Sequence, residues 1–366
     1  MYSKLRELPR GYFDVIKPEG QSLRVVGWMF RMDRPFEEFE IRVDGTAAAR
    51  EPVIELERVG KAFPRIPHAG RSGFSFTVTP QLESGVIEVA GRWADRERGR
   101  MCSAYRMDLD VLGPVPPVPL MLRVTGSNES DFFRADGLRI FADLAAAVER
   151  RGGFDRVRRM LDWGCGCGRL TAHFLADGRV AEICGTDIDS EAIAWCEGAF
   201  PQARFQQTGP YPPLPFPDGH FDLVVAYSVF THLEREVQKA WLSEMKRILS
   251  PGGLLLATVH GEFAALFNSN PANLWESLAF ELGAKPIIAG EIADSVVDGA
   301  LDGIAPAGYY RGVLQTKKYT MREWSKTLDI LEYREAGVGN YQDLVVLRRP
   351  GEGSLHPRSR TGRAGY

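Results

Sequence analysis

The sequence predicts a two-part chain, in which a small all-β sandwich precedes an α/β domain whose parallel sheet is covered by helices on both faces. Three observations lead to this fold class. Short segments of alternating apolar residues fill the first third, a proline-rich stretch occupies residues 113–119, and strands then alternate with helical periods. The length of 366 residues also fits two domains better than one.

Residues 11–112 form the predicted sandwich domain. The expected strands lie at Leu23–Phe30, Glu38–Val43, Phe74–Val78 and Ile87–Val89, and Asp44-Gly45 supplies a turn signal after the second of them. Strands at this spacing, with few helical periods between them, are typical of a β-sandwich. Residues 113–119 read GPVPPVP, which predicts a stiff extended linker that joins neither a helix nor a central strand.

Residues 120–349 form the predicted α/β domain. Expected strands are Arg158–Trp163, Ala181–Asp187, Asp222–Ala226 and Leu254–Val259. Expected helices are one with Leu138, Phe141, Ala145 and Val148 on one face, Arg169–Ala176, one beginning near Ser190, and one with Val237, Trp241, Met245 and Ile248 on one face. This alternation predicts a parallel sheet. Residues 350–366 have almost nothing to bury, and we expect a disordered tail.

Composition excludes several classes of function. Lys plus Arg number 45 against 48 Asp plus Glu, so no basic excess favours nucleic acid. No apolar run reaches the roughly 18 residues that span a bilayer, and the first residues do not read as a signal peptide. Five cysteines lack a disulfide or zinc rhythm, and no cluster of His and acidic residues has metal-ligand spacing. We therefore expect a cytosolic protein with reduced thiols and no metal.

The strongest local signal is the run LDWGCGCGR at 161–169, where a strand ends at Asp162 and Gly164, Gly166 and Gly168 precede a helix. A dinucleotide fingerprint would need its third glycine at position 169, which is arginine, and the Gly-Lys-Ser/Thr of a P-loop is absent. A cofactor with an amino-acid end suits the loop, because Asp162 can hold an ammonium while backbone N–H groups meet a carboxylate. A purely structural turn is the alternative.

A second signal is Asp187-Ile188, at the end of the next expected strand. A carboxylate there can accept hydrogen bonds from a ribose diol, and Ile188 can support an adenine ring. A helix N-cap is the alternative role of Asp187, but Asp189 and Ser190 already supply caps. Together with the glycine loop, Asp187 indicates a site for adenosine joined to an amino acid.

With these blocks in place, residues 120–349 resemble a class I S-adenosylmethionine-dependent methyltransferase. The matching runs are LDWGCGCGR, GTDID, PPLPFPDGHFDLVVAYSVFTHL and EMKRILSPGGLLLATVHG. The resemblance implies S-adenosylmethionine as cofactor and a Rossmann-like seven-stranded sheet whose last strand is antiparallel, with 330–334 and 343–348 as its final hairpin. It also implies a cofactor pocket between Gly164, Asp187 and Ser228.

One position departs from the family pattern. Many relatives carry an acidic residue after the third strand to hold the adenine amino group, whereas this chain reads FQQTGP at 205–210. Gln207 can accept that hydrogen bond through its side-chain oxygen, and a main-chain contact is the alternative.

Two histidines follow strands where a methyl acceptor should lie. His232 is the candidate catalytic base, because relatives often place a histidine or acidic residue nearby and histidine titrates near neutral pH. His260 is a candidate substrate-binding residue. A packing or capping role for His232 is the alternative, and His173, His220 and His356 are interpreted as structural or solvated.

The long segment 261–321 is interpreted as an acceptor lid. It holds the aromatic residues Phe263, Phe267, Trp275, Tyr309 and Tyr310. Tyr310 and Arg311 are its candidate substrate-binding pair. The alternative is that these aromatic residues form a small core of the segment's own.

The acceptor itself is suggested by the N-terminal half. Its runs GWMFRMDRPFEEFEIRVDG and RSGFSFTV resemble β-sandwich modules of glycosyltransferases and glycan-modifying methyltransferases. This resemblance implies O-methylation of a saccharide or glycan-linked acceptor. A quinone or polyketide acceptor, and a non-catalytic glycan-binding protein with an inert methyltransferase fold, are the alternatives; glycine spacing disfavours an NAD-dependent oxidoreductase. The sequence leaves the oligomeric state open.

Overall fold

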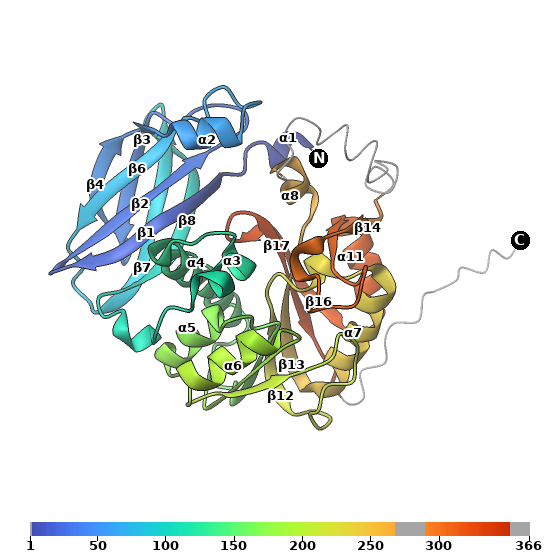
Figure 1. Cartoon of the computed structure of the whole chain (residues 1–366). Helices are drawn as coiled ribbons and strands as arrows, with labels where there is room; N and C mark the ends of the chain where they lie inside the picture. Colours follow the sequence, from blue (N-terminus) through green and yellow to red (C-terminus); the bar gives the residue numbers. More distant parts are fainter. Residues whose placement is uncertain (1, 268–289, 352–366) are drawn as a thin grey trace, which may run out of the picture.

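The computed structural model describes residues 2–267 and 290–351, which form an all-β half and a half built on one mixed sheet (Figure 1). Of the positions discussed above, Trp275 and residues 352–366 with His356 lie outside the described residues. No helix in the described ranges is long and apolar enough to cross a membrane. All five cysteines are free thiols.

The all-β half contains two antiparallel sheets of four strands, in the orders β1-β2-β6-β5 and β4-β3-β7-β8. Its elements are α1 (Tyr2–Leu5), β1 (Arg10–Glu19), β2 (Ser22–Phe30), β3 (Glu38–Val43), β4 (Thr46–Pro52), β5 (Ile54–Glu55), α2 (Glu57–Ala62), β6 (Arg71–Val78), β7 (Ser84–Trp93), β8 (Arg96–Arg106) and the 3-10 turn η1 (Asp110–Leu112). Side chains from both sheets, among them Phe13, Phe39 and Phe74, share one buried cluster. The four expected strands are present, whereas β1, β4, β5 and β8 were not anticipated.

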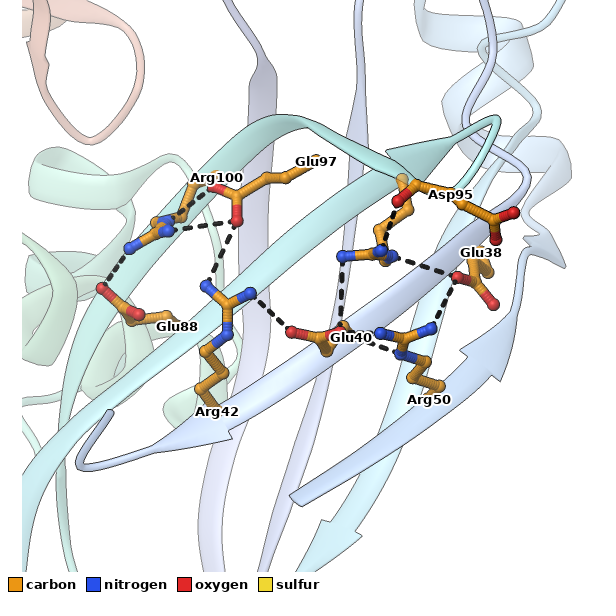
Figure 2. Close-up of polar contacts among 9 residues, drawn as sticks. Glu38, Glu40, Arg42, Arg50, Glu88, Asp95, Glu97 and Arg100 are labelled. Atoms are coloured by element: carbon orange, nitrogen blue, oxygen red, sulfur yellow. Dashed lines mark hydrogen bonds and ion pairs between the residues drawn. The ribbon is translucent and has the colours of Figure 1, made fainter. Parts of the chain in front are cut away.

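The outer face of β3, β4, β7 and β8 carries a network of paired charges (Figure 2). Glu40 is 3% exposed, and its carboxylate contacts the guanidinium groups of Arg42 at 2.6 Å, Arg50 at 2.8 Å and Arg92 at 3.4 Å. Arg100 pairs in the same way with two neighbouring glutamates. The arginines of this face therefore find their counter-charges within the face itself.

The second half contains a seven-stranded sheet in the order β11-β10-β9-β12-β13-β17-β16, as the resemblance implies. Its elements are α3 (Val118–Thr125), α4 (Ser130–Glu149), β9 (Arg159–Trp163), α5 (Arg169–Asp177), β10 (Glu182–Asp187), α6 (Ser190–Ala199), β11 (Arg204–Gln207), β12 (Phe221–Ala226), the 3-10 turn η2 (Phe230–His232), α7 (Arg235–Ile248), β13 (Leu249–Val259), α8 (Glu262–Phe267), β14 (Ile292–Val297), the 3-10 turn η3 (Gly299–Leu301), β15 (Arg311–Gln315), α11 (Lys317–Trp324), β16 (Asp329–Val338) and β17 (Gln342–Arg348). β17 runs antiparallel to β13 and β16, which confirms the expected final hairpin.

The proline-rich segment differs from its prediction as a wholly extended linker. Helix α3 begins at Val118, so Val118 and Pro119 are helical. Proline fits there because the first helical N–H groups have no partner within the helix, and the ring fixes φ near its helical value.

Helix α4 is the element that joins the two halves. Ala135 and Leu138 belong to the buried cluster of the all-β half, whereas Phe141, Leu144 and Val148 belong to a cluster beneath the mixed sheet. The helix therefore has apolar residues on two sides, whereas the sequence analysis placed Leu138 on one face together with Phe141, Ala145 and Val148. Because each half completes its core with this helix, we expect the halves to unfold together.

Replacing Leu138 with alanine should test this coupling. Leu138 is fully buried, so the lost contacts should lower the free energy of unfolding by about 2–5 kcal/mol. Urea denaturation followed by tryptophan fluorescence and by far-UV circular dichroism should show one shifted transition in both signals. Leu82→Ala, at a position 57% exposed, is the matched control and should shift the midpoint little. Separate transitions for the two signals would contradict a shared core.

Candidate active site

A cavity of about 430 Å³ opens at the carboxyl ends of β9, β10 and β12. Seven of the predicted site residues line it: Gly164, Gly166, Asp187, Ile188, Ser228, His232 and Tyr310. The carboxyl edge of a parallel sheet is where ligands bind in open α/β folds, because strand ends and helix N-termini meet there. The glycine loop and Asp187-Ile188, the two signals of the sequence analysis, therefore line the same cavity.

The glycine loop forms one wall of the cavity, and at Gly164 and Gly166 the backbone itself lines the cavity because no side chain is present. Gly164 has φ +74°, and a Cβ there would lie 2.4 Å from Cγ2 of Val229. Gly166 has φ +52°, and its Cβ would lie 2.7 Å from Cγ1 of Val124. Any side chain at either position would therefore be strained and would clash with the opposite wall. Gly168 precedes the first residue of α5 with φ +79° and does not line the cavity.

Asp187 ties the second strand to the glycine loop. Its Oδ2 accepts a hydrogen bond from the Gly166 N–H at 2.8 Å, and its Oδ1 accepts one from the Asp189 N–H at 2.9 Å. Burial raises the pKa of the Asp187 carboxyl, while these N–H donors favour the charged form. An ionised carboxylate has about four acceptor positions, so these backbone hydrogen bonds leave capacity to accept from a ligand diol. The N-cap of α6 is Asp189, as expected.

Asp162 lies behind the cavity wall and does not line it, so the structure gives no support for direct contact with an ammonium group. Its side chain is 2% exposed, and its Oδ2 accepts a hydrogen bond from the Thr171 hydroxyl at 2.7 Å. Burial raises the pKa of Asp162 to about 6. The carboxylate therefore joins the end of β9 to α5 and holds the loop between them.

The side chain of Gln207 also differs from its expected orientation. Its Nε2 donates to the Ile188 carbonyl at 3.1 Å, and Gln207 does not line the cavity. The following residues, Thr208 and Gly209, line it instead. This arrangement favours the main-chain alternative for an adenine contact.

Ser228 holds the cavity wall at the end of β12 in a left-handed conformation, with φ +58°. Its N–H donates to Thr258 Oγ1 at 2.8 Å, and its Oγ accepts a hydrogen bond from Gln342 Nε2 at 3.1 Å. A non-glycine residue at positive φ is uncommon, and such strain clusters at functional sites.

His232 presents a neutral imidazole to the cavity. Its Nδ1 lies 3.0 Å from the Arg311 carbonyl oxygen, so Nδ1 carries the proton and donates it. Nε2 then carries a lone pair. Burial lowers the pKa of His232 to about 4, against the opposing effect of that carbonyl. The Tyr310 ring stacks on the imidazole with centroids 4.0 Å apart.

The remaining two predicted substrate residues lie outside the cavity. His260 is next to His232, with ring centroids 6.4 Å apart, and does not line the cavity. Arg311 contributes its carbonyl, while its side chain pairs with Glu234 at 3.3 Å and donates to the Asp294 carbonyl. Of the lid aromatics, Tyr309 and Tyr310 line the cavity.

Helix α3 supplies a wall that the sequence analysis missed. Leu120, Leu122, Arg123 and Val124 line the cavity. Arg123 donates to Asp189 Oδ2 at 2.7 Å and to Glu191 Oε2 at 2.6 Å, which fixes α3 over the start of α6. The leucines after the prolines, Leu120 and Leu122, were the available sequence signal for this helix. Nothing in the sequence indicated that the helix contacts the glycine loop, which follows it in the chain.

Comparison with known proteins identifies the domain around this cavity. Residues 160–253 match the model of the methyltransferase domain family. A fatty-acid O-methyltransferase of Mycolicibacterium smegmatis is 30% identical over 144 residues, which covers 39% of this chain and 48% of that protein. A phthiotriol/phenolphthiotriol dimycocerosates methyltransferase of Mycobacterium ulcerans is 29% identical over 177 residues, covering 47% of this chain and 56% of that protein. The chain thus spans about half the length of these curated relatives.

Among solved structures, a Burkholderia thailandensis 1,6-didemethyltoxoflavin-N1-methyltransferase aligns with 15% identity and a TM-score of 0.39, covering 59% of this chain and 79% of that one. Residues 160–253 of this chain thus carry a methyltransferase domain, in agreement with the expectation of S-adenosylmethionine as cofactor. The glycine loop, Asp187 and Ile188 fit such a group, because the cavity combines bare backbone with a carboxylate and an apolar wall.

Replacing Asp187 with alanine should weaken binding of S-adenosylhomocysteine by about 1–3 kcal/mol, because the variant loses a buried acceptor that also orders the loop. Isothermal titration calorimetry measures this change directly. Asp222→Ala is the matched control, since Asp222 Oδ2 also accepts two backbone N–H groups at 3.0 Å but lies at the opposite edge of the sheet. Equal losses in both variants would point to general destabilisation.

Proposed function

We propose that this protein transfers a methyl group from S-adenosylmethionine to an oxygen atom of an acceptor bound beside His232. The observation that carries the proposal is the hydrogen bond from His232 Nδ1 to the Arg311 carbonyl, at the wall of the cavity that also holds Asp187. It leaves Nε2 as a proton acceptor at the place where an acceptor hydroxyl can lie.

The chain's own residues divide the work between binding and proton transfer. The glycine loop and Asp187 hold the amino-acid and ribose ends of the cofactor, and Ile188 with the main chain at Thr208 and Gly209 encloses the adenine. S-adenosylmethionine supplies a methyl group on a sulfonium, a good leaving group. Alignment and exclusion of water therefore provide most of the catalysis that this site must supply.

His232 accepts the acceptor's hydroxyl proton in this proposal. Its pKa of about 4 keeps the imidazole neutral at physiological pH, so the base is always in its accepting form. The stacked Tyr310 ring and the Arg311 carbonyl fix the plane of the imidazole. A fixed plane directs the Nε2 lone pair at one position in the cavity.

Two acceptor classes fit the proposal. A saccharide or glycan-linked acceptor is supported by the resemblance of the N-terminal half, which we propose to be a β-sandwich accessory domain. An apolar acceptor is favoured by the lining around His232, where Val229, Leu233 and Leu301 contribute apolar side chains. The similarity to the fatty-acid O-methyltransferase of Mycolicibacterium smegmatis supports the same class.

The experiment that tests the proposal is a methylation assay with a small acceptor panel. The protein is incubated with isotopically labelled S-adenosylmethionine and octyl glucoside, decanol or a hydroquinone, and products are identified by mass spectrometry. Transfer to an oxygen of one acceptor supports the proposal and selects its class. Binding of S-adenosylhomocysteine without transfer to any hydroxyl or carboxylate in a broad panel would favour a non-catalytic role.

The pH dependence of the methylation rate should report the protonation state of the His232 imidazole. Because only the neutral imidazole accepts a proton and its pKa is about 4, the rate should be constant above about pH 5 and fall below about pH 4. His232→Gln should lower kcat by about 10²–10⁴-fold with little change in S-adenosylhomocysteine affinity. His220→Gln, in the turn before β12, is the control. Parallel loss of cofactor affinity and rate would assign His232 a packing role.

A further inference from the structure

A line of partly exposed rings leads from the cavity toward the all-β half. His232 contacts Tyr310 inside the cavity and lies 6.4 Å from His260 on the other side. His260 lies 5.4 Å from Tyr341, whose ring lies 4.2 Å from the Arg10 guanidinium. The four rings in this line are each partly exposed, whereas Arg10 is 5% exposed. The line therefore begins at the proposed base and ends at a buried cation.

Arg10 contacts aromatic rings but has few hydrogen-bond partners. Its guanidinium lies over the rings of Tyr12, at 4.4 Å, Tyr341, at 4.2 Å, and Trp28, at 5.8 Å. Nη1 makes a long hydrogen bond of 3.4 Å to the Gly11 carbonyl, and the buried Nε has no partner. No carboxylate in residues 2–267 or 290–351 lies within 4.0 Å of this guanidinium. A buried guanidinium without a counter-ion is costly, so such a group calls for an explanation.

A second buried guanidinium increases the local positive charge. Arg139 lies 5.0 Å from the centroid of the Tyr12 ring, donates to the same Gly11 carbonyl at 2.9 Å, and also has a buried Nε without a partner. In contrast, the arginines on the outer face of the all-β half pair with glutamates around Glu40 (Figure 2). Among the residues that the structure describes, Arg10 and Arg139 are thus two neighbouring buried guanidinium groups without a carboxylate within 4.0 Å, and they lie at the end of the ring line.

We infer that the edge of the Arg10 guanidinium binds an anionic group, a carboxylate or a phosphate, of an elongated acceptor whose body lies along His260 and Tyr341. This inference rests on the proposed function, since it makes the ring line an extension of the acceptor site. A planar guanidinium in contact with aromatic rings presents its N–H fork in a fixed direction, which is the arrangement that recognises carboxylates in a bidentate way. Arg10 is then a determinant of acceptor specificity.

Matched pairs of probes test the inference on the full chain saturated with S-adenosylhomocysteine. Octyl glucuronide is compared with octyl glucoside, and decanoate with decanol, by calorimetric titration. The wild type should bind the anionic member of at least one pair about tenfold or more tightly. Arg10→Gln should remove this preference while leaving the neutral probe's affinity unchanged, and Arg10→Lys should retain part of it because the charge remains without the fork.

Arg98→Gln is the matched control, because Arg98 also belongs to the all-β half and has a buried Nε without a partner. It should keep the full preference. Equal affinity for both members of each pair in the wild type, or a preference that survives in Arg10→Gln, would overturn the inference while the affinity for S-adenosylhomocysteine still supports the proposed function. A purely structural Arg10 would instead lower the thermal midpoint and weaken both probes together. Failure of the wild type to bind S-adenosylhomocysteine would overturn both proposals.

Discussion

The burial of α4 between two different sheets is the constraint on which the arrangement of the molecule depends (Figure 1). A helix buried on two sides cannot shift toward one sheet without opening a gap at the other, because protein interiors are close-packed. Arg139 strengthens this restriction, since its guanidinium joins the Gly11 carbonyl of β1 to the Asn340 side chain in the β16–β17 hairpin. The all-β half is thereby held against the β16–β17 hairpin of the seven-stranded sheet.

Within the cavity, the polar residues at the strand ends serve mainly to order backbone. Asp162 accepts from the Thr171 hydroxyl behind the loop, and Asp187 accepts from the Gly166 N–H within it. Between these two carboxylates the chain adopts a run of positive φ values that only glycine adopts without strain. The loop is therefore preorganised before any cofactor arrives, so cofactor binding does not have to supply the energy that orders it.

The parts that the sequence predicted well are those governed by local pattern. The glycine spacing after a strand predicts the glycine turn, and the resemblance of the ordered sequence blocks implies the seven-stranded sheet; both are present. The parts that failed depend on tertiary contact. No local pattern tells that α3 folds over the glycine loop, that the Gln207 amide turns to the Ile188 carbonyl, or that the Arg311 side chain leaves the cavity. Proline at a helix start also looks the same in sequence as proline in a linker.

The segment after β14 contributes a main-chain group to the site, the Arg311 carbonyl, as well as the side chains of Tyr309 and Tyr310. The Arg311 carbonyl accepts the Nδ1 proton of His232, and main-chain geometry in β15 determines where that carbonyl lies. β15 is in turn fixed by pairing with β14 and by the hydrogen bond from the Gln315 N–H to the His260 carbonyl. The tautomer of the proposed base is thus set by backbone, so the identity of the side chain at 311 matters less than the register of the strand that carries it.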